Sequence, residues 1–249
     1  RYKTVADKDY YLYIKRPATK APQNGFPTII FFFGGGWVGG DPSMFASHAS
    51  MFAAKGFFTV LAEYRVKERD GIDTPGPCIM DGKSAIRWLR ENHSFLNIDP
   101  TKITAVGGSA GGHVALSAAV FDGFNEKTDN LSVSAVPDYI ILFNAVLNVS
   151  AEGYTGMMEN RPPEELVKFS PYHHIKAPLP PILIFHGYRD TMVPVQNARD
   201  FYEKVSSFGG FIKYVEFEDE EHALVKFSSE KTKERILVEM TNFLVGVSR

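Results

Sequence analysis

The stretch ITAVGGSAGGH, residues 103–113, joins four residues suited to a buried strand directly to a serine flanked by glycines. Residues 107–111 fit the pattern G-x-S-x-G, in which the serine sits on a sharp turn between a strand and a helix. A helix predicted over residues 109–120 would aim its positive N-terminal end at an anion formed beside the serine. We therefore interpret Ser109 as a nucleophile for acyl transfer. The alternative is a glycine-rich turn that only connects a strand to a helix.

Strands and helices alternate on both sides of this turn. The uninterrupted apolar residues 28–33 are typical of a central strand covered by helices on both faces, and residues 5–15 resemble an edge strand. Further strands are expected over residues 57–62, 139–143, 182–185 and 211–217, and further helices over residues 44–55, 78–91, 195–207 and 230–247. This order predicts an α/β protein with a mostly parallel, doubly wound sheet, formed by residues 1–249 as a single domain.

Composition excludes several classes of protein. The formal net charge is −2 and the basic residues form no stripe, so we expect no nucleic-acid partner. The longest apolar run, residues 29–33, is far shorter than the roughly 20 residues that cross a bilayer, so no membrane span is predicted. The single cysteine, Cys78, excludes an internal disulfide and a cysteine-built metal site. It is compatible with a cytoplasmic or a periplasm-like compartment, and we favour a secreted or periplasmic location.

A second glycine-rich stretch follows the predicted central strand. Residues 34–40, GGGWVGG, contain five glycines in seven residues. Glycine lets the backbone approach a ligand and lets several N–H groups converge on one point, so this stretch is predicted to bind a ligand. A flexible connection is the alternative. A phosphate-binding loop is disfavoured, because the glycines match neither G-x-x-x-x-G-K-[ST] nor G-x-G-x-x-G.

A serine nucleophile needs an imidazole base and a carboxylate that orients it. Of the seven histidines, His222 is the most plausible base, because it follows the predicted strand 211–217 on a loop. Asp190 follows the strand 182–185 in the same way and is the expected carboxylate. Ser109, Asp190 and His222 then occur in the order Ser, Asp, His that characterises one known arrangement of the triad. His48, His93 and His113 are interpreted as solvated or buried residues. His173 and His174 are adjacent, and a metal site there is disfavoured because no supporting carboxylates are evident. His186 closes the predicted strand 182–185 in the loop that carries Asp190.

Residues 148–181 interrupt the alternation of strands and helices. The segment carries six prolines and is too long for a simple connection. We interpret it as a small irregular cap over the carboxyl edge of the sheet, where open α/β sheets bind ligands. An ordinary surface insertion without substrate contact is the alternative.

Three motifs resemble those of the serine esterases of the α/β-hydrolase fold, from about residue 26 onward. Residues 33–37, FGGGW, resemble the H-G-G-G-W oxyanion loop, and residues 107–111 resemble the nucleophile elbow. Residues 186–194, HGYRDTMVP, resemble the acid loop H-G-x-x-D-x-x-V-P. The sequences EYR at 63–65 and DPTKI at 99–103 are most similar to the small bacterial acetylxylan and feruloyl esterases. The resemblance implies an ester substrate, either a small molecule or an acylated polysaccharide, and no cofactor or metal.

Phe33 departs from the family pattern, which has a histidine before the three glycines. That histidine helps to fix the loop, and phenylalanine cannot make its hydrogen bond, so we expect the rigidity of the loop to change. The resemblance implies an oxyanion hole formed by Gly35, Gly36 and Ala110. We expect it to persist, because main-chain N–H groups supply its hydrogen bonds.

Aromatic and methionine side chains are candidates for the substrate pocket, although each is equally compatible with packing. The candidates are Trp37, Tyr64, Tyr154, Met157, Met158 and Tyr188. Two other functions are alternatives: a serine peptidase of the prolyl-oligopeptidase type, which shares the serine and acid-loop motifs, and a non-catalytic small-molecule receptor on the same fold. The first generally carries a large propeller domain, and the second often lacks a member of the triad.

Overall fold

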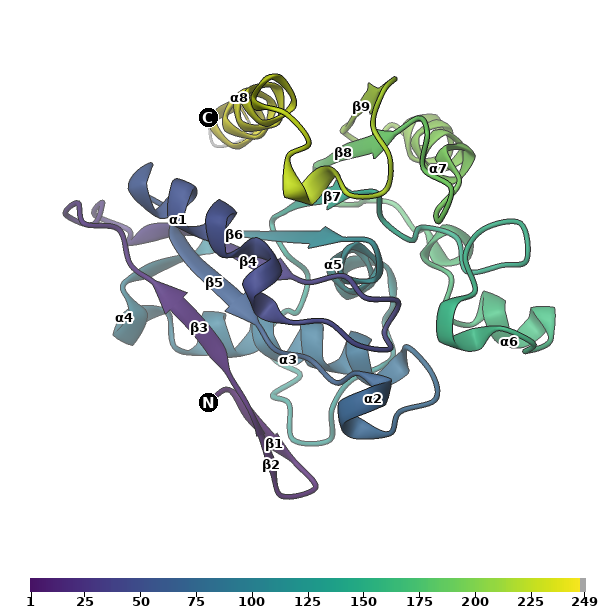
Figure 1. Ribbon diagram of the computed structural model, residues 1–249. Helices are drawn as coiled ribbons and strands as arrows, with labels where there is room; N and C mark the ends of the chain where they lie inside the picture. The colour runs from purple at the N-terminus through teal and green to yellow at the C-terminus, as the bar shows by residue number, and fades with distance from the viewer. Residues whose placement is uncertain (247–249) are drawn as a thin grey trace.

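The computed structural model describes residues 1–246, and Val247, the last residue of the predicted final helix, lies outside them. A seven-stranded sheet in the order β3-β5-β4-β6-β7-β8-β9 forms the centre of the molecule (Figure 1). Its strands are β3 (Leu12–Lys15), β4 (Phe26–Phe32), β5 (Phe58–Ala62), β6 (Ile98–Gly108), β7 (Tyr139–Phe143), β8 (Ile182–Gly187) and β9 (Ile212–Phe217). All neighbouring strands are parallel except β3, which is antiparallel to β5, so the expected fold class is confirmed.

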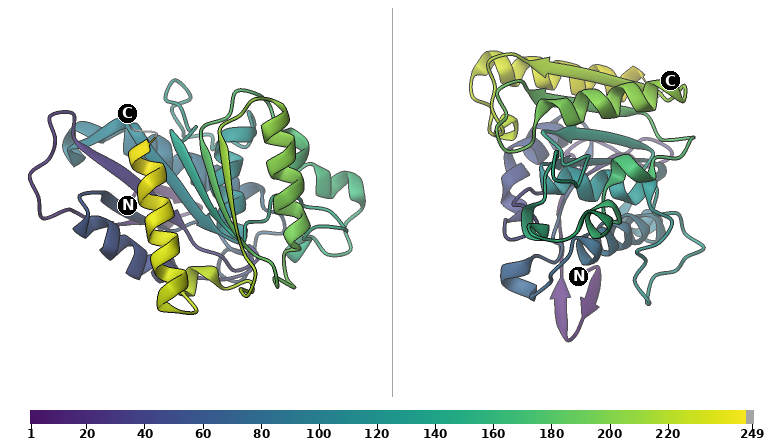
Figure 2. Two further views of the ribbon diagram at one scale, coloured as in Figure 1. Left: turned by 90° about the horizontal axis from the view of Figure 1, so that it is seen from above. Right: turned by 90° about the vertical axis from the view of Figure 1, so that its right-hand side faces the viewer.

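Helices cover both faces of the sheet, as the buried apolar strand β4 requires. One face packs against α1 (Ala46–Ala54) and α8 (Glu230–Gly246), through Phe52 and Met240 among others. The other face packs against α3 (Gly76–Glu91), α5 (Ala110–Val120) and α7 (Val195–Ser207). Figure 2 shows α7 and α8 on opposite sides of the sheet. None of the helices within residues 1–246 combines the length and apolar character needed to cross a bilayer.

Two predicted elements are organised differently from the sequence-based expectation. The first 15 residues form a hairpin of β1 (Lys3–Val5) and β2 (Lys8–Tyr10) followed by β3, rather than one edge strand. The predicted helix over residues 44–55 begins as the short 3-10 helix η1 (Pro42–Phe45), with the Asp41 side chain accepting a hydrogen bond from the Ser43 N–H, and continues as α1. Both differences lie where short polar stretches adopt local turns that hydrophobic periodicity does not reveal.

A buried ion network attaches the N-terminal hairpin to the rest of the fold. The Lys3 ammonium lies 2.6 Å from the carboxylate of Asp81 in α3, whose side chain is fully buried. Arg65 lies 2.7 Å from the same carboxylate. Both cations also contact Glu126, at 2.9 Å and 2.7 Å, so two positive and two negative groups meet. Mutual pairing offsets the large cost of removing these charges from water.

Residues 148–181 connect β7 to β8 without adding a strand. They contain the short helices η2 (Gly156–Met158), α6 (Pro163–Val167) and η3 (Pro171–His174), and η3 packs on α5. Two further short helices, α2 (Lys67–Asp70) and α4 (His93–Leu96), and the turn η4 (Leu224–Lys226) complete the described elements. Because the carboxyl ends of parallel strands meet at one edge, the loops after β4, β6, β8 and β9 can gather around one site.

Candidate active site

Ser109 occupies a strained turn between β6 and α5. Its φ of 53° and ψ of −122° place a non-glycine residue in a rarely adopted backbone region. The turn is possible because the chain passes close to itself at Gly107 and Gly111. At position 107 a Cβ atom would lie 2.2 Å from the carbonyl oxygen of Gly111. At position 111 a Cβ atom would lie 2.1 Å from the carbonyl oxygen of Phe32. The two glycines are therefore required by the turn that presents the Ser109 hydroxyl.

His222 meets Ser109 from the loop that follows β9. Its Nε2 lies 2.9 Å from the Ser109 Oγ, and its Nδ1 lies 2.8 Å from the Oδ2 of Asp190. One imidazole thus bridges a hydroxyl and a carboxylate that are distant in the sequence. When Nδ1 carries the proton toward the carboxylate, Nε2 is free to accept the proton of the hydroxyl.

Asp190 lies on the loop that follows β8, and several hydrogen-bond donors hold its carboxylate in place. The backbone N–H groups of Met192 and Val193 both donate to its Oδ1 at 2.9 Å. The Asn144 amide donates to its Oδ2 at 2.7 Å. Burial alone would raise the pKa of Asp190, but the hydrogen bonds from His186, His222 and the Val193 N–H hold this pKa well below its usual range.

The other histidines lie outside this group or support it. His186 is fully buried, and its Nε2 lies 2.9 Å from the Val193 carbonyl oxygen and 3.3 Å from Asp190. His48 is enclosed by aromatic rings, and burial lowers its pKa to about 4. His113 in α5 is also buried, with its Nε2 2.7 Å from the Phe169 carbonyl oxygen. His93, His173 and His174 contact nearby backbone or hydroxyl groups. Within residues 1–246 no cluster of ligand side chains could hold a metal ion.

The glycine-rich loop after β4 lies directly against Ser109. A Cβ at Gly34 would come within 3.2 Å of the Ser109 Cβ, and both Gly35 and Gly36 have positive φ values, of 132° and 62°. Among the described residues, no acceptor pairs with the backbone N–H of Gly35 or Gly36. Ala110 is the first residue of α5, a position whose N–H has no partner within the helix. Three backbone donors therefore remain available near the serine.

Phe33 is held by packing where the family has a histidine. Its ring stacks on that of Tyr64, with ring centroids 4.1 Å apart and planes inclined by 15°. The Tyr64 hydroxyl donates to the Phe33 carbonyl oxygen. On the other side, a Cβ at Gly40 would lie 2.6 Å from the Phe33 ring. Stacking and close packing thus constrain the loop, although the hydrogen bond of a histidine side chain is missing.

A cavity of about 600 Å³ opens above Ser109. The predicted cap reaches it through Tyr154 and Gly156. Trp37 and Tyr64, which we expected in the pocket, do not line this cavity, because both are fully buried in the core. Met157 packs against the core and Met158 is buried in it, while Tyr188 is 54% exposed outside the cavity and lies under Arg199.

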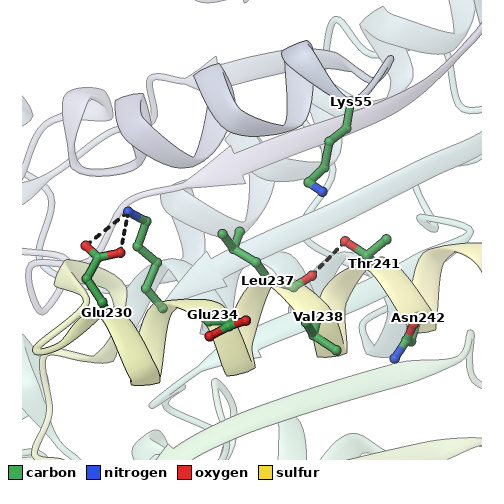
Figure 3. A pocket seen from close by; sticks show the side chains of 8 residues that line it. Lys55, Glu230, Glu234, Leu237, Val238, Thr241 and Asn242 are labelled. Atoms are coloured by element: carbon green, nitrogen blue, oxygen red, sulfur yellow. Dashed lines mark hydrogen bonds and ion pairs between the residues drawn. The ribbon is translucent and has the colours of Figure 1, made fainter.

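Sequence reasoning missed most of the side chains that line the cavity. These are Val38, Met44, Phe143, Met192, Ala223, Val225 and Lys226. Phe143 ends β7 at the carboxyl edge of the sheet, a position that the strand prediction could have indicated. The others lie on loops or in the short helices η1 and η4, where no periodicity marks the side that faces a cavity. A separate hollow of about 430 Å³ between Lys55 and α8 shares no residue with this cavity (Figure 3).

The sheet and its covering helices define an α/β-hydrolase fold. The chain belongs to the BD-FAE family, which matches residues 12–205. It is 36% identical to a thermophilic esterase from Thermogutta terrifontis whose structure has butyrate bound, with a TM-score of 0.88 over 99% of this chain and 92% of that one. A structure of the same esterase has propionate bound.

Relatives with curated names are longer proteins. The chain is 31% identical to the "Probable carboxylic ester hydrolase LipM" of Mycobacterium tuberculosis, over 72% of this chain and 44% of that protein. It is 30% identical to the endo-1,4-beta-xylanase B of Butyrivibrio fibrisolvens, over 64% of this chain and 27% of that protein. The chain thus spans less than half the length of either relative.

Proposed function

We propose that the protein is a serine carboxylic-ester hydrolase with Ser109 as nucleophile, His222 as general base and acid, and Asp190 as the carboxylate that orients the imidazole. One observation carries the proposal. The Ser109 Oγ, the His222 ring and the Asp190 carboxylate form an unbroken hydrogen-bonded chain, with distances of 2.9 Å and 2.8 Å, beside the cavity. The esterase relatives support the same reaction class.

In the first half-reaction, the Ser109 Oγ attacks the ester carbonyl carbon while His222 Nε2 accepts the hydroxyl proton. The tetrahedral intermediate collapses when the bond to the alcohol oxygen breaks, and His222 gives its proton to the departing alcohol. Water then attacks the acyl-enzyme, with His222 as base, and releases the carboxylic acid and the free serine. The low pKa of Asp190 keeps this carboxylate ionised, so it stabilises the imidazolium formed in each step.

The oxyanion of both intermediates would be bound by backbone N–H groups of Gly35, Gly36 and Ala110. These donors lie next to the nucleophile and have no competing partner in the described chain. Their positions are fixed by the fold, so stabilising the negative charge requires no reorganisation. Removing one donor of this type typically costs about 10²- to 10³-fold in kcat.

We propose acyl esters of plant or algal polysaccharides such as xylan as the substrates, with acetyl as the acyl group and feruloyl as the alternative. The butyrate and propionate bound to the Thermogutta terrifontis esterase support a small acyl group, and the similarity to a protein named as a xylanase supports a carbohydrate. Tyr154 in residues 148–181, the proposed cap, offers an aromatic face toward a sugar ring or an acyl group. A secreted or periplasmic location belongs to the same proposal.

Hydrolysis of p-nitrophenyl acetate tests the reaction class. The wild-type protein should release p-nitrophenol, and Ser109→Ala should reduce the rate to that of buffer while the protein stays folded by circular dichroism. Ser117→Ala is the matched control, since Ser117 is a buried serine of the same helix. Unchanged turnover in Ser109→Ala would refute the triad.

Natural acylated glycans test the substrate class. Acetate or ferulate should be released from acetylated or feruloylated xylan by the wild-type protein, and not by Ser109→Ala. Peptide substrates serve as the comparison, because a serine peptidase would cleave them. Activity confined to peptides would replace the esterase proposal with that alternative, and absence of turnover on every ester would favour a receptor.

A further inference from the structure

Tyr154 approaches the glycine loop more closely than any other side chain of the cap. Its hydroxyl would lie 2.7 Å from a Cβ atom at Gly36, so only a glycine at position 36 accommodates it. Gly36 and Tyr154 line the same cavity as Ser109. The hydroxyl therefore lies beside Gly36, the residue whose backbone N–H is one of the three donors proposed for the oxyanion.

The position of this tyrosine is fixed by its surroundings. The Tyr154 N–H donates to the Asn148 carbonyl oxygen at 3.1 Å, and the ring centroid lies 5.7 Å from that of Trp37. Gly156, with a φ of 51°, lets the chain turn tightly around both rings, because a Cβ there would lie 2.7 Å from Tyr154 and 2.9 Å from Trp37. The cap therefore holds the ring in one place.

The hydroxyl itself has no hydrogen-bond partner within residues 1–246. The residue is only partly buried and lines the cavity, and its hydroxyl lies against Gly36, which lines the same cavity. A fixed polar group that is left without a partner at the edge of a reaction site is available to a substrate. A residue needed only for packing would gain nothing from the hydroxyl in this position.

We propose that the Tyr154 hydroxyl donates a hydrogen bond to the oxyanion, beside the N–H of Gly36, and that Tyr154 is a further catalytic residue. The inference rests on the proposed ester hydrolysis and adds one side-chain donor to the three backbone donors. Burial raises the pKa of Tyr154, so the phenol keeps its proton at neutral pH and serves as a donor. The cap then takes part in the chemistry as well as in binding the substrate.

Tyr154→Phe isolates the hydroxyl, because the ring and its contact with Trp37 remain. With p-nitrophenyl acetate, kcat should fall about 10²-fold with little change in KM, since the donor acts mainly on the charged intermediate. A trifluoromethyl ketone, whose carbonyl forms an oxyanion when it is attacked by the serine, should bind about 10²-fold more weakly. The matching methyl ketone, which mimics the uncharged ester, should bind almost unchanged.

Tyr188→Phe is the matched control, because Tyr188 is exposed outside the cavity. This substitution should change neither kcat nor the affinity for either ketone. Equal kcat and equal ketone affinities in wild type and Tyr154→Phe would overturn the inference. An equal loss of affinity for both ketones would also overturn it, because it would assign the hydroxyl to ground-state binding. A different result would refute the proposed ester hydrolysis itself: the wild-type protein would hydrolyse no ester and bind no trifluoromethyl ketone.

Discussion

Phe33 and Tyr64 stack face to face, with ring centroids 4.1 Å apart, at the base of the glycine-rich loop. Together with the close approach of Gly40 to the Phe33 ring, this stacking constrains the loop. The Tyr64 hydroxyl adds a second link, because it donates to the carbonyl oxygen of Phe33. The geometry of the proposed oxyanion hole therefore depends on a residue that the substrate does not reach.

Tyr64→Ala should lower kcat on p-nitrophenyl acetate about 10²-fold, because a shift of about 1 Å in the backbone donors weakens their hydrogen bonds to the oxyanion. It should also cost about 3–5 kcal/mol in the free energy of unfolding, as expected for a buried aromatic ring. Tyr64→Phe keeps the stacking and loses only the link to Phe33, so its kcat should fall much less. Steady-state kinetics and urea unfolding measure both effects. Full activity in Tyr64→Ala would show that the loop is held by other contacts.

Asp190→Asn should reduce kcat by about 10⁴-fold, because the amide can stabilise the wrong tautomer of His222 and provides no negative charge. Asp219→Asn is the control, since Asp219 is an exposed carboxylate of the neighbouring acidic loop and pairs with Arg189. Single-turnover kinetics with p-nitrophenyl acetate measures the loss. If Asp219→Asn were the damaging change, the carboxylate would have been assigned to the wrong loop.

Gly111→Ala should prevent the native turn at Ser109. The new Cβ would lie 2.1 Å and 2.2 Å from the carbonyl oxygens of Phe32 and Phe33, and these are backbone atoms in the central strand and its end. We expect a loss of at least about 3 kcal/mol in the free energy of unfolding, together with the esterase activity. Gly123→Ala introduces the same methyl group where nothing lies within 4 Å, so it should be tolerated. Equal stability of the two variants would contradict the geometry of the turn.

Stability should fall as the pH drops from about 6.5 toward 4. Burial lowers the pKa of His48 and of His113 to about 4, so both stay neutral in the folded state at a pH where the unfolded chain binds a proton. Folding then releases protons, and acidification favours the unfolded chain. Each histidine should cost about 2 kcal/mol between pH 7 and pH 5.

His48→Phe tests this assignment, since phenylalanine suits the aromatic surroundings of position 48 and does not titrate. Urea unfolding at pH 7 and pH 5 should show a pH dependence weaker by about 2 kcal/mol in the variant. His93→Phe, at a more exposed histidine, controls for the introduction of a phenylalanine. A full pH dependence in His48→Phe would mean that the loss of stability has another source.

The fold was predictable from the sequence because its central features are local. The apolar run that became β4, and the strand, turn and helix around Ser109, each carry a pattern of hydrophobicity or glycine spacing that only a few structures satisfy. The residues that precede α1 carry no such pattern. They form the 3-10 helix η1 instead, which the Asp41 side chain caps. Helix and strand limits elsewhere moved by a few residues, since they depend on the surrounding contacts.

The catalytic triad was more predictable from the sequence than the residues that line the pocket. Ser109, Asp190 and His222 each follow a strand, and parallel strands bring such positions to one edge, so their proximity could be inferred before the structure. The pocket residues could not be chosen in this way, because Tyr64 and Tyr154 are the same residue type and yet one is buried in the core and the other lines the cavity. Whether an aromatic side chain faces a cavity or the core is decided by tertiary packing, which no local pattern records.

The ion pairs of Lys3 matter for the design of shortened versions of this protein. The Lys3 ammonium is one of two cations that neutralise the fully buried Asp81, so trimming the first few residues would leave Arg65 to balance both Asp81 and Glu126 alone. A tag attached at this end is better separated by a flexible spacer than fused in place of the opening residues. The segment around Lys3 is thus a working part of the scaffold, despite its distance from the reaction.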